Sequence, residues 1–133
     1  MEKKHPIQII DLQVRKLELL VHDPIECRKE NQEAVVVLKH GNTSFDEEQE
    51  VIVIGFLCEI NKNLNEDSYK PFEMCVELFG IFSVGSEFPK DKIEHWSNHN
   101  APYILLPYIR ENVTGLLARA GIRFHLPLVQ IIR

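Results

Sequence analysis

The chain has 133 residues, 15 basic and 20 acidic side chains, and a formal net charge of −5. This length fits one domain, and 44% apolar beside 26% charged residues is the composition of a folded globular protein. The acidic balance, without a basic cluster, argues against a nucleic-acid binder, and no apolar run approaches the roughly 20 residues of a membrane span.

The N-terminus and the cysteines indicate a cytoplasmic protein. Residues 1–6 are polar and charged and lead into an apolar–polar alternation, without the apolar core of a secretory signal. Cys27, Cys58 and Cys75 are odd in number and form no C-x-x-C pair. A disulfide scaffold or a zinc ribbon is therefore not expected.

The first apolar segment, residues 7–21, fits two structures. Apolar residues alternate with polar ones from Ile10 to Val14 and then continue on the opposite parity from Leu17 to Val21. This pattern predicts a long strand with a bulge near Lys16. The spacing also fits one face of a helix, and the period alone leaves both open.

Three further β-branched or aromatic runs predict strands at residues 34–39, 51–57 and 72–82. His40–Ser44 and Asn61–Ser68 read as turns between them. Connections this short favour antiparallel pairing over β–α–β units.

The second half predicts a helix from Asn100 to Gly121, with these two residues as its caps. Gly115 within it indicates a close approach by another element. Strands first and helices last give an α+β fold as a single domain over residues 1–133. One apolar stripe is expected along the helix, at Leu105, Ile109, Val113, Leu116 and Ala120.

No group of residues favours an enzyme. His95 and His99 have a spacing that suits a metal, but a third ligand is missing, so two surface histidines are the simpler interpretation. Cys58 and Cys75 on neighbouring strands are expected to be buried small hydrophobes. We expect no catalytic residues, no metal and no cofactor.

Three segments resemble the SecB family of protein-export chaperones. Phe72–Ser83 is similar to the family's fourth strand, which ends in Gly-Ile-Phe-Ser, and Asn100–Glu111 is similar to its Pro-x-Ile-Leu-Phe-Pro-Tyr-x-Arg-Glu helix opening. Leu126–Val129 matches the loop that follows that helix. The resemblance implies a four-stranded antiparallel Greek-key sheet with a long helix packed on it, a strand at residues 7–21, and a homotetramer built as a dimer of dimers.

The resemblance also implies an ATP-independent function, in which unfolded preproteins are held in apolar grooves and delivered to the translocase motor SecA. A surface that accepts many sequences needs exposed apolar and aromatic side chains. The candidates for this client-binding groove are Phe45, Phe79, Phe82, Phe88, Trp96, Tyr103, Phe124 and Leu128.

Two further surfaces are expected to meet partners. A subunit interface is predicted at Leu105, Ile109, Val113, Gly115 and Leu116. The positions that dock SecA in the family fall at Lys16, Leu20, Glu73 and Cys75, and only Glu73 is acidic, with Glu18 and Glu77 nearby. SecA binding is therefore expected to be weak.

The sequence thus predicts a SecB-like, non-enzymatic chaperone of unfolded polypeptides that supports export. One alternative is a SecB-like chaperone dedicated to a single client, such as the antitoxin of a toxin–antitoxin pair. An alternative of another class is a small-ligand-binding module that uses a cavity under the helix.

Overall fold

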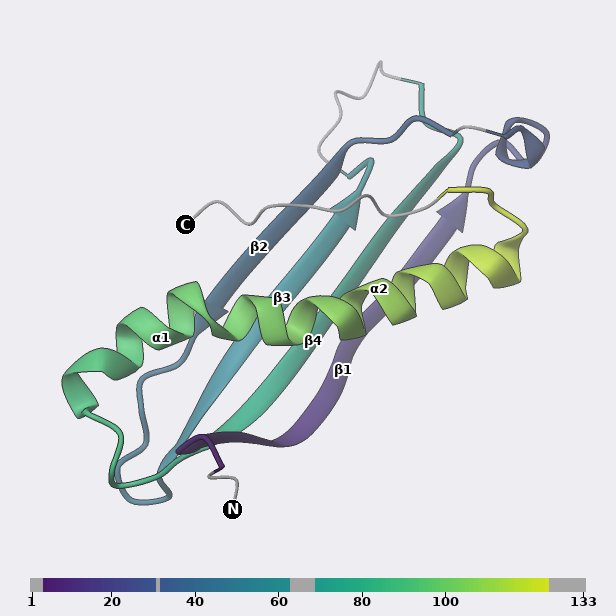
Figure 1. Ribbon diagram of the computed structural model, residues 1–133. Helices are drawn as coiled ribbons and strands as arrows, with labels where there is room; N and C mark the ends of the chain where they lie inside the picture. The colour runs from purple at the N-terminus through teal and green to yellow at the C-terminus, as the bar shows by residue number, and fades with distance from the viewer. Residues whose placement is uncertain (1–3, 31, 63–68, 125–133) are drawn as a thin grey trace.

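The computed structural model describes residues 4–30, 32–62 and 69–124, and it has two layers, a sheet and a pair of helices (Figure 1). Short 3-10 turns at Glu26–Arg28 and Lys90–Lys92 precede β2 and α1. The main elements are, in chain order, β1 (Ile7–Val21), β2 (Val36–Asn42), β3 (Val51–Ile60), β4 (Phe72–Val84), α1 (Ile93–His99) and α2 (Ala101–Ala120).

The four strands form one antiparallel sheet in the order β1-β4-β3-β2. The hairpin-connected strands β2, β3 and β4 follow one another, and β1 lies beside β4 after a long connection, which is a Greek key. The predicted α+β fold with a four-stranded Greek-key sheet and one long helix is confirmed. Residues 7–21 are a strand, and a register shift between Val14 and Lys16 lies where the change of parity predicts a bulge.

Strand β2 extends further than the sequence predicts. Gly41 pairs with Gly55 and Asn42 with Ile54, so the predicted turn at His40–Ser44 begins only after Asn42. Pairing with β3 provides hydrogen-bond partners for the backbone groups of Gly41 and Asn42, which a turn would have to satisfy locally. This gain overrides the low strand propensity of Gly and Asn.

Helix α2 ends as predicted but begins differently. Gly121 has φ 71°, a left-handed conformation that ends helices, and the Ile122 N–H donates to the Leu117 carbonyl at 2.9 Å. Asn100 makes no side-chain cap hydrogen bond, so its predicted capping role is wrong. Its backbone is already helical (φ −110°, ψ −45°), whereas an N-cap residue needs an extended backbone.

The core lies between α2 and one face of β3 and β4. On the helix, Leu105, Ile109, Val113 and Leu117 are buried at constant spacings of four. The predicted stripe is wrong at Ala120, which is exposed, whereas Leu116 is half-buried and packs against the core beside Leu117. The strands supply alternate residues, of which the largest completely buried are Ile52, Ile54, Phe56, Ile60, Phe72, Met74, Leu78 and Phe82.

The close approach of helix and sheet occurs at Gly80 and not at Gly115. A Cβ atom on Gly80 would lie 2.9 Å from both Leu105 Cδ2 and Phe82 Cε2, which a real Cβ atom cannot tolerate. A Cβ atom on Gly115 would meet nothing within 4 Å in the described part of the chain. The prediction of a close approach at Gly115 is therefore wrong within the subunit.

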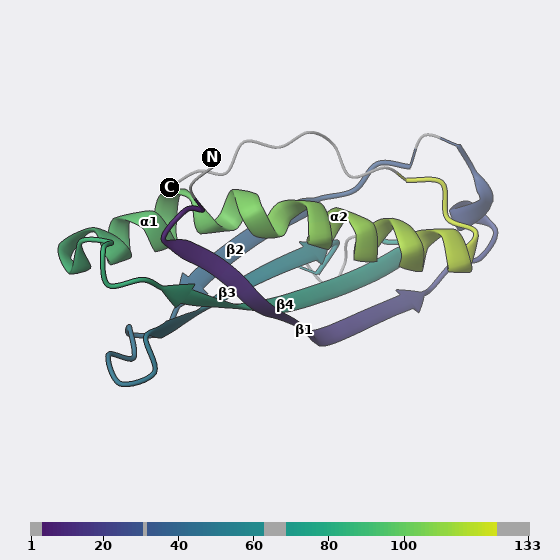
Figure 2. The ribbon, with the colours of Figure 1, turned by 60° about the horizontal axis from the view of Figure 1, so that its bottom comes forward.

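Both helices lie on the same side of the sheet, as the edge-on view shows (Figure 2). No described helix or strand covers the opposite side, which we call the outer face. Side chains alternate between the two sides, so the outer face carries the residues that lie between the core residues of each strand.

Candidate functional site

Large apolar side chains are exposed along β1, at the end of the sheet where β1 ends, and in the first turn of α2. Five of them lie on β1, although β1 is a long strand that pairs with β4 along its whole length. The described residues in this class are Ile10, Val14, Leu17, Leu20, Val21, Ile25, Val35, Tyr69, Tyr103 and Ile104.

The exposure of β1 follows from the position of α2. The helix packs chiefly on β3 and β4, so β1 is both an edge strand and outside the cover of the helix. Val14, Leu17 and Val21 pair with core positions of β4 and thus face the helix side, yet they remain 49%, 44% and 42% exposed. We call these three residues the β1 strip. A long apolar edge of this kind is a template for pairing with another chain.

Two of the predicted groove aromatics lie close together at the end of the sheet where β1 begins and β4 ends. Phe45, after β2, and Phe88, after β4, line a notch of about 140 Å³ together with Val84 and Ile93. Both rings are half-buried and accessible from the notch. The Lys90–Glu47 ion pair, 3.6 Å long, lies at its rim.

Two other predicted groove residues are in the core, so their prediction as client contacts is wrong. Phe82 and Trp96 pack edge to face with ring centroids 5.2 Å apart, and they retain only 1% and 6% exposure. This edge-to-face pair joins α1 to the sheet and stabilises the packing between them.

The remaining predicted groove residues are scattered. Tyr103 is exposed on α2, Phe124 packs on Phe72 with ring centroids 6.3 Å apart, and Phe79 lies on the outer face. Leu128 lies outside the described residues. A single subunit therefore does not assemble the seven described residues of this set into one groove.

Three residues of the predicted subunit interface are in the core of the subunit. Leu105, Ile109 and Val113 have 0% exposure because they pack onto the sheet, so their prediction as interface residues is wrong. Gly115 and Leu116 are half-buried and remain a prediction.

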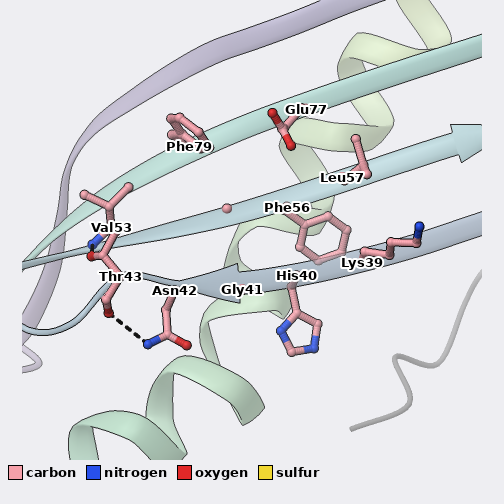
Figure 3. A pocket seen from close by; sticks show the side chains of 11 residues that line it. Lys39, His40, Gly41, Asn42, Thr43, Val53, Phe56, Leu57, Glu77 and Phe79 are labelled. Atoms are coloured by element: carbon pink, nitrogen blue, oxygen red, sulfur yellow. Dashed lines mark hydrogen bonds between the residues drawn. The ribbon is translucent and has the colours of Figure 1, made fainter.

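The outer face carries a hollow of about 350 Å³ between β2 and β4 (Figure 3). Gly41, Gly55 and Phe79 occupy one row across three strands, and two of the three lack a side chain. Figure 3 shows Leu57 and Val53 on the same side as Phe79. The pairing of the two glycines is not evident from the sequence, where Gly41 lies in a predicted turn.

The acidic residues predicted for partner docking lie on the outer face, but each has a basic partner. Glu77 pairs with Arg15, and Glu18 pairs with Lys62. The Lys62 ammonium also lies 3.2 Å from Glu73.

Glu73 has the strongest set of partners. It accepts from Lys70 and Lys62, and His22 Nε2 lies 3.6 Å away. The hydrogen bonds from Lys70 and then Lys62 outweigh the effect of burial and lower the pKa of Glu73 to about 2. The carboxylate is thus satisfied within the subunit.

A second apolar patch, not evident from the sequence, lies at the end of the sheet where β1 leads into the connection to β2 (residues 22–35). We call this segment the crossover connection. Ile25 is 67% exposed and Tyr69 is 64% exposed. The Tyr69 hydroxyl donates to Asp23, whose other carboxylate oxygen accepts from the Ile25 and Glu26 N–H groups. The connection contains no aromatic residue of its own, and Tyr69 from the β3–β4 loop supplies one there.

The described histidines and cysteines form no reactive centre. His95 and His99 stack with ring centroids 3.9 Å apart. Among the described residues no three His, Cys, Asp or Glu side chains are placed to hold a metal ion. Cys58 and Cys75 lie on neighbouring strands but on opposite faces of the sheet, and burial raises the pKa of the Cys58 thiol to about 12.

No protein-family model and no curated protein sequence matches the chain. Among solved structures it resembles the Mycobacterium tuberculosis SecB-like chaperone Rv1957, in complex with a ChAD peptide from the Rv1956 HigA1 antitoxin. The TM-score is 0.73 at 17% identity, over 96% of this chain and 94% of that chain. A protein of unknown function from Streptococcus agalactiae gives a TM-score of 0.40 at 14% identity, over 92% of this chain and 97% of that chain.

The chain therefore has the SecB-like fold, and the resemblance that Phe72–Ser83 and Asn100–Glu111 predict is confirmed at the level of the fold. No helix in the described ranges is long and apolar enough to cross a membrane.

Proposed function

We propose that this protein is a cytoplasmic, ATP-independent chaperone that binds unfolded polypeptide, and that it serves a dedicated client such as an antitoxin. The observation that carries the proposal is the exposed apolar surface away from the β1 strip, at Ile25, Tyr69 and the notch beside Phe88, on a fold shared with a SecB-like chaperone. Exposed apolar surface on this scale marks a site of interaction, because a soluble monomer gains nothing from leaving it in water.

Two observations favour a dedicated client over general export. The structural neighbour is described in complex with a peptide from an antitoxin. The carboxylates available for a basic docking tail, Glu18, Glu73 and Glu77, are engaged by lysine and arginine side chains of the same subunit. A SecA tail would have to displace these partners, which weakens its attraction.

The assembly that we propose is a homotetramer, a dimer of dimers. The β1 strip and the unpaired edge of β1 provide the contact surface, because pairing with a second copy removes both from water. Light scattering should give a mass near four times the 15.5 kDa subunit, with a stable dimer on dilution. A monomer at micromolar concentration would overturn this assembly.

In the described part of the chain, the space between helix and sheet gives no support to the small-ligand alternative. Leu105, Ile109 and Val113 fill this space with no exposed surface. The described hollows lie on the outer face, at the end of the sheet near Phe88 and under the crossover connection.

The test of the function is a holdase assay without nucleotide. The protein should slow the aggregation of a reduced, unfolded model protein and should ignore the native form of the same protein, because only the unfolded chain offers apolar segments. Equal, weak binding of both forms would overturn the proposal.

A further inference from the structure

We propose that the hollow on the outer face is a second client site, which takes one large, uncharged apolar side chain of an extended client segment. The inference rests on the proposed function and adds a site that lies across the sheet from the helices and from the β1 strip. Its occupant follows from the shape, the polarity and the charge of the hollow.

The hollow exists because the sheet lacks side chains at one place. Gly41 and Gly55 are directly opposite each other on β2 and β3, and Phe79 follows in the same row on β4. A Cβ atom on Gly55 would lie 3.4 Å from Phe79 Cε1, so the aromatic ring leans over Gly55 and forms a wall. A Cβ atom on Gly41 would meet nothing within 4 Å, so the space is open above Gly41.

The exposed surface that lines this space is mostly apolar, although the polar residues Asn42 and Thr43 also line it. Val53 and Leu57 lie two residues before and after Gly55 and thus point to the same face. The Arg15 guanidinium lies 5.6 Å from the centroid of the Phe79 ring, which helps to hold that ring in place. The lining therefore favours an apolar group.

The charged groups around the hollow have partners within the subunit. Lys39 pairs with Glu59 at 3.3 Å, and Glu77 pairs with Arg15. A charged side chain that entered the hollow would lose its hydration without gaining a counterion. Charge complementarity therefore selects an uncharged occupant.

The volume and the position of the hollow indicate an extended chain. About 350 Å³ is near the lower end of ligand pockets, so it suits one large side chain rather than a helix. The hollow lies beside β2, the edge strand of the sheet, where a chain can lie across the surface and direct alternate side chains inward.

The variant that tests the site is Gly41→Leu, which fills the hollow. Gly41 has no positive φ and free space for a side chain, and leucine suits a strand better than glycine, so the fold should be at least as stable. The matched control is Ser83→Leu. It adds the same side chain to the same face, about four residues further along β4 from Phe79.

The probe is a reduced, iodoacetamide-blocked model protein, and its affinity is measured by calorimetry. We expect wild type and Ser83→Leu to bind alike, and Gly41→Leu to bind at least about fivefold more weakly. Because the hollow is neutral, the difference should persist in high salt. If wild type and Gly41→Leu bind alike, the hollow is not a client site, although the chaperone function stands. If wild type does not bind, both proposals fail.

A cross-linking measurement locates the contact directly. The three native cysteines are buried, so a benzophenone reagent can be attached at Thr43→Cys beside the hollow or at Ser83→Cys away from it. We expect the unfolded probe to cross-link at position 43 and not at position 83. Equal cross-linking at both positions would overturn the site. A change in the oligomeric mass of Gly41→Leu would also overturn it, because the hollow would then be a subunit contact.

Discussion

The two faces of the sheet are built from alternate residues of the same strands, yet they carry different kinds of surface. On β3, Ile54 and Phe56 are completely buried under α2, while Val53 and Leu57 on the outer face are half-exposed. Gly80 lies tightly against Leu105, whereas open space surrounds Gly41 on the outer face. Packing on the helix side fixes the fold, and the outer face is free for contacts.

This comparison predicts that equal substitutions have unequal effects on the two faces. Leu105→Ala should lower the free energy of unfolding by about 3 kcal/mol, because it leaves a cavity between α2 and the sheet. Leu57→Ala on the outer face should lower it by less than about 1 kcal/mol. Urea unfolding of both variants measures the difference, and equal losses would contradict the comparison.

The glycines sharpen the same comparison. Gly80→Val should lower the free energy of unfolding by about 2 kcal/mol, since the new side chain collides with Leu105. Gly55→Ala, whose Cβ atom would lie 3.4 Å from the Phe79 ring, should change it by less than about 0.5 kcal/mol. Denaturation midpoints of the two variants are the measurement. A Gly80→Val variant of wild-type stability would show that helix and sheet are not closely packed there.

The fold was predictable because the strong local patterns agree with the tertiary contacts. The alternation in residues 7–21 changes parity where the strand has its register shift, and Gly121 ends α2 in the left-handed conformation. The errors occur where tertiary contacts decide. Pairing with β3 drew Gly41 into a strand, and the direction of α2 buried Leu117 and left Ala120 exposed.

The candidate site was less predictable for a physical reason. The sequence offers Phe82 and Phe88 as equal candidates for a groove. Only the packing shows that Phe82 is in the core and that Phe88 lies beside a notch. The hollow at Gly41 and Gly55 depends on an absence of side chains in two strands at once. That feature can be recognised only when the register of β2 against β3 is known.

A third region, the β1 strip, differs from both faces because it lies on the helix side but outside the cover of α2. Leu17→Glu places a charge in the proposed subunit contact, and it should weaken association by at least about tenfold. The control Gln13→Glu adds the same charge on the outer side of the same strand and should leave the mass unchanged. Light scattering over a dilution series compares the two, and an unchanged mass for Leu17→Glu would remove the strip from the interface.

The ion pairs of the outer face should contribute to stability only above acidic pH. The pKa of Glu73 is about 2, below its ordinary value of 4.5, so the unfolded chain takes up this proton more readily than the folded one. The contribution is complete above about pH 4.5 and is lost as the pH falls towards 2. Glu73→Gln should be less stable than wild type by about 1 kcal/mol at neutral pH, and the two should converge in acid. Parallel curves would contradict this role.

The smallest expected effect concerns basic partners of the outer face. Glu73 is held by Lys70, so a lysine-rich peptide finds little uncompensated negative charge there, and we expect wild type to bind it only weakly. Lys70→Ala frees one side of this carboxylate and should raise the affinity about threefold at low salt.

Lys90→Ala changes the net charge equally but breaks a pair near the notch, so it serves as the control. Calorimetry should show the gain only for Lys70→Ala, and salt should abolish it, because exposed charges are screened over about 8 Å at physiological ionic strength. Tight binding by wild type that survives salt would show that the outer face does attract a basic partner, and general export would then regain support over a dedicated client.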